Sequence, residues 1–239
     1  MKYLYGPVQS RRLGFSLGVS VIPFKTCSFD CIYCQLGRTG CHQTLRSDWV
    51  KGESVIAELG EWFQAHPREA KKLDYVTFAG CGEPTLHSRL GEIMDRVREI
   101  TGTPIAVITN ASLFNNPEVR RMVSGADLVI PSLDAATSDV FRKINRPAPG
   151  IHLQDIIDGL IAFRREYSGN IWLEIMLLAG VNDAPEHIAE LRKLVDKIKP
   201  DKVQLNSPVR APEEAGVEGI PGERLEEIRT AFGPACELV

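Results

Sequence analysis

Six short apolar segments alternate with amphipathic stretches along the 239 residues of this chain, and this alternation limits the folds that it can adopt. The segments are rich in valine and isoleucine and nearly continuously apolar, as strands buried on both faces of a sheet should be. They are Leu17–Ile22, Tyr75–Phe78, Ile105–Thr109, Leu128–Ile130, Ile171–Leu178 and Lys202–Leu205. Strands that alternate with helices predict right-handed βαβ units around a parallel sheet.

Apolar residues at helical spacing fill the intervals between these strands, over residues 55–63, 90–100, 153–161, 188–198 and 225–232. Pro117 suits the first turn of a further short helix. Because the sequence shows no internal repeat and no linker, we expect a single α/β domain over residues 1–239 with parallel strands. The loop-rich segment 207–222 carries several Pro, Gly and Glu residues, and we expect a mobile loop or lid there.

Three of the six cysteines lie in one loop, residues 24–38, with the spacing C-x3-C-x2-C: Cys27, Cys31 and Cys34. Three thiolates spaced in this way can hold three corners of a [4Fe–4S] cluster and leave the fourth iron without a protein ligand. An iron with an open coordination position can bind a substrate as well as pass electrons. The loop follows the first expected strand, and parallel α/β folds bind their ligands at the C-terminal ends of strands.

Two motifs carry a resemblance to a known family. The cysteine loop, with Tyr33 just before its third cysteine, resembles the signature loop of the radical S-adenosylmethionine (SAM) enzymes. Gly80-Cys81-Gly82-Glu83-Pro84 resembles the Gly-Gly-Glu-Pro motif of that family, with Cys81 where many relatives have Gly or Ser. The segments 10–14 and 143–147 are similar to an uncharacterised branch near the tRNA wybutosine synthases and the activating enzymes. The resemblance implies a partial (β/α)6 barrel of the TIM type, a [4Fe–4S] cluster and SAM.

The resemblance also implies roles for individual residues. The cluster ligands, and hence the catalytic residues, would be Cys27, Cys31 and Cys34. The amino group of SAM would meet Gly80, Gly82, Glu83 and Pro84, whose backbone carbonyls and carboxylate accept from an ammonium. The ribose hydroxyls and the methionine carboxylate would lie near Asn110, Ser132 and Asp134, and the adenine near Tyr33, Leu205 and Asn206. From the residues alone, capping or turn formation explains Asn110, Ser132 and Asp134 equally well.

Glu174 is a polar side chain within an otherwise apolar strand. A buried carboxylate needs a partner, so Glu174 is a candidate to face the barrel interior and the substrate. An outward position on an edge strand is the other interpretation.

Cys41 and His42 lie close behind the loop and keep other interpretations open. Either residue could complete a structural zinc site with the three cysteines, and Cys41 could complete a four-cysteine electron-transfer cluster. The alternative to an enzyme is therefore a non-catalytic Fe–S electron carrier or a zinc-stabilised binding module. Neither interpretation explains the Gly-Cys-Gly-Glu-Pro segment. Neither explains why polar residues such as Asn110, Ser132 and Asn206 follow the expected strands.

The net charge and the cysteines of the chain indicate which partners and which cell compartment to expect. A net charge of −3 gives no global basic field for nucleic acid, and no apolar run approaches membrane-spanning length. Six cysteines without a secretory signal favour reduced thiols in the cytoplasm. Several basic residues are candidates to face a substrate: Arg11, Arg12, Lys25, Arg38, Arg142, Lys143 and Arg146.

The chemistry implied by the resemblance is reductive cleavage of SAM to methionine and a 5′-deoxyadenosyl radical, which abstracts hydrogen from a substrate. The electron would come from an external flavodoxin- or ferredoxin-like donor under anaerobic conditions. A barrel of only six units is open at its mouth, so we expect a macromolecular substrate, a partner protein more than an RNA.

Overall fold

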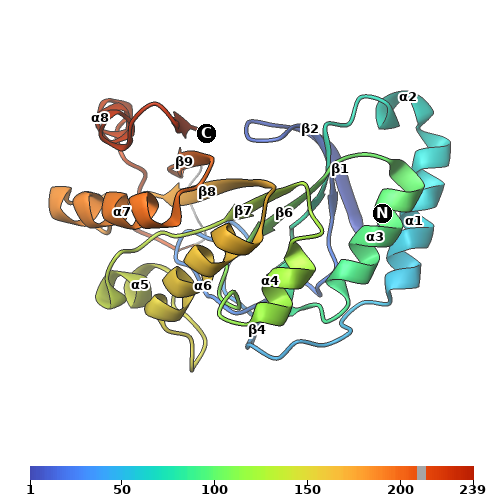
Figure 1. Ribbon diagram of the computed structural model, residues 1–239, viewed down its shortest axis with the longest axis horizontal. Helices are drawn as coiled ribbons and strands as arrows, with labels where there is room; N and C mark the ends of the chain where they lie inside the picture. The colour runs from blue at the N-terminus through green and yellow to red at the C-terminus, as the bar shows by residue number, and fades with distance from the viewer. Residues whose placement is uncertain (209–213) are drawn as a thin grey trace.

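One curved sheet of eight strands forms the centre of the molecule (Figure 1). The computed structural model describes residues 1–208 and 214–239. In spatial order the strands are β1 (Leu4–Ser10), β2 (Gly14–Val19), β5 (Tyr75–Phe78), β6 (Ile105–Thr109), β7 (Leu128–Pro131), β8 (Asn170–Met176), β9 (Lys202–Asn206) and β10 (Cys236–Leu238). Within the described residues the two outer strands, β1 and β10, do not pair with each other. The structure is therefore an open, partial barrel.

All six expected strands are present and pair in parallel, as predicted. The first lies three residues earlier than expected, because residues 20–22 leave the sheet toward the cysteine loop. Two edge strands were not predicted. β1 runs antiparallel to β2 and buries only Leu4 fully, and β10 is three residues long. Neither strand has the continuous apolar run by which a buried strand is recognised.

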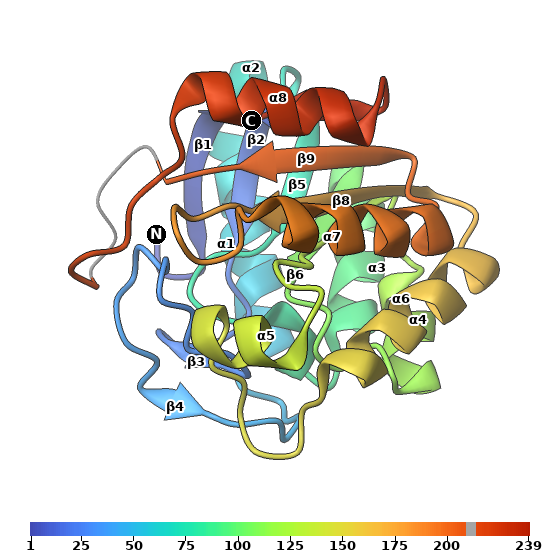
Figure 2. The ribbon, with the colours of Figure 1, turned by 90° about the vertical axis from the view of Figure 1, so that its left-hand side faces the viewer.

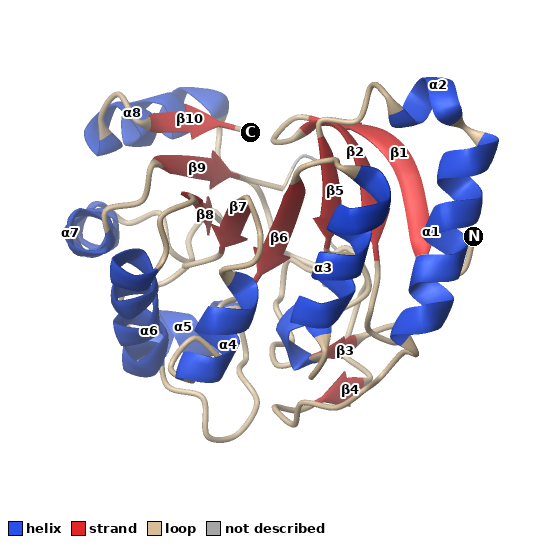
Figure 3. Cartoon of the chain, turned by 45° about the vertical axis from the view of Figure 1, so that its right-hand side comes forward, coloured by secondary structure: helices blue, strands red, loops and turns tan. Residues whose placement is uncertain are grey.

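The helices on the outer face of the sheet come from the amphipathic stretches (Figure 3). They are α1 (Gly52–Ala65), α3 (Leu90–Thr101), α4 (Pro117–Val123), α6 (Leu153–Glu166) and α7 (Pro185–Ile198). α8 (Gly222–Phe232) packs beside β9 and β10, while α2 (Pro67–Ala70), α5 (Ser138–Ile144) and the 3-10 turn η1 (Pro84–Leu86) are short additions. In α3 the residues buried against the sheet, Leu90, Ile93, Met94 and Val97, follow the helical period.

The C-terminal ends of the strands face a separate two-stranded sheet (Figure 2). Its strands, β3 (Thr26–Cys27) and β4 (Cys41–His42), pair in parallel and enclose the cysteine loop between them. The loop-or-lid prediction for 207–222 falls partly on residues 209–213, which lie outside the described residues. In the part of the chain that the structure describes, no helix combines the length and the apolar character needed to cross a bilayer.

Candidate functional site

The cysteine loop is held firmly against the barrel. Cys27 ends β3, and Cys31 and Cys34 follow in the turns after it; all three are free thiols and half-buried. The backbone N–H of Ile32 donates to the Ile144 carbonyl at 3.0 Å, at the end of α5. The Phe29 ring packs edge-on against Phe141 of the same helix, with 5.4 Å between ring centroids. These contacts fix the position of three thiols that the sequence separates by only a few residues.

Each sulfur of the loop lies beside a side-chain nitrogen. Lys25 Nζ is 3.2 Å from Cys34 Sγ, Asn145 Nδ2 is 3.5 Å from Cys31 Sγ, and Asn110 Nδ2 is 3.6 Å from Cys27 Sγ. These nitrogens come from three different elements: the start of the loop, the end of α5 and the end of β6. The sulfur atoms therefore lie in an environment of N–H donors.

Burial raises the pKa of the Cys27 and Cys31 thiols. It raises the pKa of Cys27 to about 12, with the neighbouring Glu83 carboxylate as the second cause. It raises the pKa of Cys31 further, helped by Asp134 and opposed by the Asn145 amide. Without a metal both thiols stay protonated at neutral pH, so that ligand binding at these sulfurs must displace protons.

The Gly80–Pro84 segment lies directly against the loop. The Lys25 N–H donates to the Cys81 carbonyl at 2.7 Å, and the Glu83 N–H donates to the Thr26 carbonyl at 3.1 Å. A β-carbon on Gly82 would lie 1.9 Å from the Thr26 carbonyl oxygen, so only glycine fits this approach. The two motifs that carry the family resemblance are thus packed together.

The Glu83 side chain is directed into the fold, and its contact with SAM stays a prediction. Glu83 is 2% exposed. Its Oε1 accepts hydrogen bonds from the Thr85 N–H (3.0 Å) and from the hydroxyls of Thr85 and Thr109 (2.6 Å each), and its Oε2 accepts from the Asn110 N–H (2.7 Å). Four donors saturate a carboxylate. In this structure Glu83 therefore ties η1 to the end of β6.

A cavity of about 590 Å3 opens beside the loop at the ends of the strands. Six residues of the predicted site line it: Tyr33, Cys34, Gly80, Ser132, Asp134 and Asn206. Gln35 and Leu36 of the cysteine loop also line it, as do Ser207 and Pro208, which follow the last predicted strand. The sequence did not predict the positions of Ile108 on β6 and Met176 on β8, because neither residue belongs to a motif.

Asp134 is a hydrogen-bonded centre on the wall of this cavity. One carboxylate oxygen accepts from the Tyr33 hydroxyl and from Asn145 Nδ2, each at 2.7 Å, and the other accepts from the Met176 N–H at 2.9 Å. Burial raises the pKa of Asp134 to about 6, against the lowering effect of these donors. Burial and the Asp134 charge also raise the pKa of Tyr33. Asp134 therefore links β7, β8 and the cysteine loop.

Glu174 faces the cavity, which decides between the two positions considered for it. The residue is 7% exposed, and its carboxylate accepts from Arg12 Nη1 at 2.5 Å and from Asn206 Nδ2 at 3.1 Å. Arg12 belongs to the turn between β1 and β2, and both Arg11 and Arg12 line the cavity. The Arg12–Glu174 ion pair thus joins the turn between β1 and β2 to β8 at the cavity.

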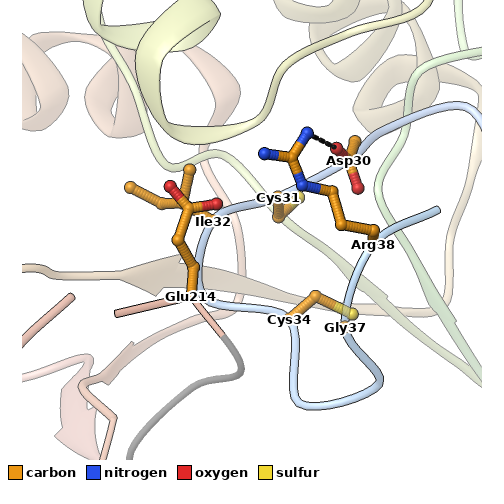
Figure 4. A pocket seen from close by; sticks show the side chains of 7 residues that line it. All are labelled: Asp30, Cys31, Ile32, Cys34, Gly37, Arg38 and Glu214. Carbon is orange, nitrogen blue, oxygen red and sulfur yellow. Dashed lines mark ion pairs between the residues drawn. The ribbon is translucent and has the colours of Figure 1, made fainter. Parts of the chain in front are cut away.

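A second cavity, of about 300 Å3, lies on another side of the loop (Figure 4). Its lining residues are Asp30, Cys31, Ile32, Cys34, Gly37, Arg38 and Glu214. Charges here are paired within the chain: Arg38 lies 3.7 Å from Asp30, and Arg146 binds Glu214 through two contacts of 2.5 and 2.6 Å. Cys34 borders both cavities and is therefore reached from two sides.

Two residues for which adenine or ribose contacts are predicted do not line the large cavity, and their contacts with SAM stay predictions. Leu205 is buried on β9 in an apolar cluster with Ile175 and Leu177 and does not line the large cavity. The Asn110 amide is turned toward the cysteine loop, with Nδ2 2.8 Å from Ser28 Oγ. The reason in both cases is strand alternation and loop geometry, which place a side chain on one face or the other and cannot be read from residue type.

No three His, Cys, Asp or Glu side chains within residues 1–208 and 214–239 converge closely enough to hold one metal ion. A structural zinc ion needs four ligands around a single centre. In an iron–sulfur cluster each cysteine binds a different iron, so the three thiols need not share one centre. The geometry therefore does not support the zinc interpretation with Cys41 or His42.

Comparisons with known proteins agree with this geometry. A profile of the Radical SAM superfamily matches residues 21–193. A UPF0026 protein of Methanocaldococcus jannaschii is 37% identical over 97% of this chain and 71% of its own length. A protein named GTPase Obg from Brachyspira hyodysenteriae is 41% identical over 99% of this chain, which spans only 34% of that protein. The Dual-specificity RNA methyltransferase RlmN of Nitratidesulfovibrio vulgaris is 28% identical over 72% of this chain and 48% of its length.

Solved structures share the fold at low identity. The structure of TYW1 with a lysine-pyruvate adduct superposes with a TM-score of 0.69 at 17% identity, over 91% of this chain and 72% of that one. A radical SAM methyltransferase from Sphaerobacter thermophilus gives 0.72 at 20% identity, over 94% of this chain and 65% of that one. With the profile match, these likenesses show that the chain belongs to the radical SAM superfamily, whose enzymes use a [4Fe–4S] cluster and S-adenosylmethionine.

Proposed function

We propose that this chain binds a [4Fe–4S] cluster through Cys27, Cys31 and Cys34 and uses it to cleave SAM reductively. The observation that carries the proposal is the position of three free thiols in one fixed loop, of which Cys34 borders a cavity formed by the strand ends. Such a cluster, once reduced, would supply the electron for cleavage of SAM to methionine and a 5′-deoxyadenosyl radical, which would abstract hydrogen from a substrate.

The residues of the loop fit such a cluster. Three cysteines leave one of four irons without a protein ligand, and Cys34 borders the cavity where that iron would meet SAM. The cavity volume of about 590 Å3 falls within the usual range for small-molecule sites. Its polar groups can accept hydrogen bonds from an ammonium or from ribose hydroxyls: Ser132, Asp134, Glu174 and Asn206.

We assign the remaining motif residues to support of this cavity. Gly80 reaches the cavity through its backbone with φ at 108°, a conformation that favours glycine. Gly82, Glu83 and Asn110 hold the Gly80 segment against the cysteine loop through the contacts described above, and Pro84 begins the 3-10 turn η1 that follows. Tyr33, fixed by its bond to Asp134, borders the same cavity, which supports a contact with the adenine or ribose.

The described residues offer no second cluster as the source of this electron. Cys41, Cys81 and Cys236 lie on three separate elements or turns, and this scatter gives no support for a second cluster among the described residues. We therefore propose an external one-electron donor of the flavodoxin or ferredoxin class.

For the substrate we propose a protein or peptide. Four of the basic residues considered for substrate contact are neutralised within the chain, by the pairs Arg12–Glu174, Arg38–Asp30, Arg142–Asp139 and Arg146–Glu214. Phosphates would compete with these carboxylates for the arginines. The likeness to an RNA methyltransferase makes RNA the second candidate. A binding assay on beads that carry bulk tRNA distinguishes the two candidates. Binding of the reconstituted protein to these beads at physiological salt, with no binding to beads without tRNA, would favour RNA.

The test is anaerobic reconstitution with iron and sulfide, followed by electron paramagnetic resonance of the dithionite-reduced protein with and without SAM. We expect about four irons and four sulfides per chain, and a change of the spectrum when SAM is added. A spectrum that SAM does not alter would contradict binding at the cluster.

A further inference from the structure

Lys25 places a buried positive charge against the cysteine loop. The residue is 5% exposed, and its Nζ lies 3.2 Å from Cys34 Sγ. In the described part of the chain no carboxylate lies within 4.0 Å of this ammonium, although most other lysine and arginine contacts near the site are to carboxylates. A buried cation is costly unless an anion accompanies it. A metal-bound thiolate at Cys34 would be that anion.

The backbone holds Lys25 in this position at a conformational cost. Its N–H donates to the Cys81 carbonyl at 2.7 Å, and its carbonyl accepts from the Cys41 N–H at 2.9 Å. Its φ of 55° is in the left-handed region, which is unfavourable for a non-glycine residue. Strain of this kind persists where the surrounding structure fixes the residue, and here it directs the side chain to the sulfur.

The two asparagines at the other sulfurs are fixed as well. Asn145 Nδ2 donates to Asp134 at 2.7 Å while lying 3.5 Å from Cys31 Sγ. The Asn110 side chain donates to Ser28 Oγ at 2.8 Å and accepts from the Ser112 N–H at 3.0 Å. The Asn110 backbone N–H donates to Glu83 at 2.7 Å. Neither amide is free to rotate, so each sulfur keeps its N–H donor.

From this arrangement we propose that Lys25, Asn110 and Asn145 are positioning residues that set the reduction potential of the cluster. The proposal rests on the proposed function, in that it takes the three cysteines as the ligands. Reduction adds one electron, from dithionite in the test or from a low-potential protein donor, and makes the cluster more negative. Donors and a positive charge at the sulfurs stabilise the reduced form and raise the potential. Lys25 contributes most because its donor is charged.

The experiment is a redox titration of the full-length, anaerobically reconstituted protein, monitored by the reduced-cluster signal. In Lys25→Met we expect the ratio of reduced to oxidised cluster at a given potential to fall about tenfold. For a one-electron couple this corresponds to a midpoint potential about 59 mV lower. Lys25→Arg, which keeps a charged donor, should stay close to the wild-type midpoint. Lys71→Met, which removes the same charge at an exposed position after α2, should not move it.

A Lys25→Met protein with a full cluster and the wild-type midpoint would overturn the inference. If Lys25→Met holds no cluster, Asn110→Leu and Asn145→Leu decide: a lowered midpoint in either supports the inference, and wild-type midpoints in both overturn it. Failure of the proposed function is distinct from these results, because the wild-type protein itself would then bind no four-iron cluster.

Discussion

Tyr33 and Asp134 are joined by a hydrogen bond of 2.7 Å that connects the cysteine loop to the end of β7. The two residues are 101 positions apart in the sequence. Because Asp134 also accepts from Met176 and Asn145, one buried carboxylate fixes the loop, β8 and the end of α5 relative to one another.

Tyr33→Phe removes one of the three donors to Asp134 and leaves part of a buried carboxylate unsatisfied. We expect the free energy of unfolding of the metal-free protein to fall by about 1–3 kcal/mol at pH 7. Urea denaturation measures this difference. Tyr75→Phe is the matched control, since the Tyr75 hydroxyl makes no hydrogen bond with the described residues. Equal losses in both variants would contradict the role given to the Tyr33 hydroxyl.

The raised pKa of Asp134 predicts a pH dependence of stability. The pKa of Asp134 is about 6 in the folded state, against an ordinary value of 3.8, so the folded state binds the proton more tightly. The associated stability is complete below pH 4 and is lost as the pH rises through 6, by roughly 3 kcal/mol in total. Carbon-13 NMR of the metal-free protein should show a carboxyl titrating near pH 6 that disappears in Asp134→Asn. A midpoint near 4 for this residue would refute the prediction.

Gly82→Ala tests the contact between the two motifs. A β-carbon there would lie 1.9 Å from the Thr26 carbonyl oxygen, so the Gly80 segment and the loop must separate. We expect the free energy of unfolding to fall by several kcal/mol, measured by denaturation, or SAM binding to be lost, measured by equilibrium dialysis with labelled SAM. Gly60→Ala in α1 meets nothing within 4 Å and should instead stabilise the protein by up to about 1 kcal/mol. Normal SAM binding by Gly82→Ala would argue against the packing described.

Cysteine replacements separate the three-cysteine site from a four-cysteine one. Cys31→Ala should abolish cluster binding, since it removes a ligand from the centre of the loop. Cys41→Ala should keep the iron content of the wild type, because the Cys41 backbone, not its thiol, makes the contact with Lys25. Iron and sulfide analysis after reconstitution distinguishes the variants. Loss of the cluster in Cys41→Ala would instead support a four-cysteine electron carrier.

Periodicity was sufficient to predict the strands and helices that are buried. Six apolar runs became the parallel strands β2 and β5–β9, because continuous burial leaves an unambiguous pattern. β1 was not predictable in this way, because Leu4 is the only buried one of its seven residues and the strand forms by antiparallel pairing with β2. The short helix α5 was missed because its seven residues bury only Phe141 and Ile144.

The site was predictable as far as spacing and strand ends determine it. The structure brings the cysteine loop, Gly80, Ser132, Asp134 and Asn206 to one end of the barrel, as expected from parallel strands. The directions of Glu83 and Asn110 were not predictable, since a side chain at a strand end can point to a ligand or back into the fold. The signal for Asn145 was present in the Lys143–Pro147 segment, but its distance to Cys31 exists only in the folded chain.

The most direct test of the central claim is the formation of 5′-deoxyadenosine. Anaerobically reconstituted protein would be mixed with dithionite and SAM, and the products separated by chromatography. The account predicts 5′-deoxyadenosine and methionine in equal amounts from the wild-type protein, and neither from Cys27→Ala, Cys31→Ala or Cys34→Ala. A wild-type protein that carries a four-iron cluster and binds SAM, yet forms no 5′-deoxyadenosine even with cell-extract protein and RNA fractions added, would contradict it.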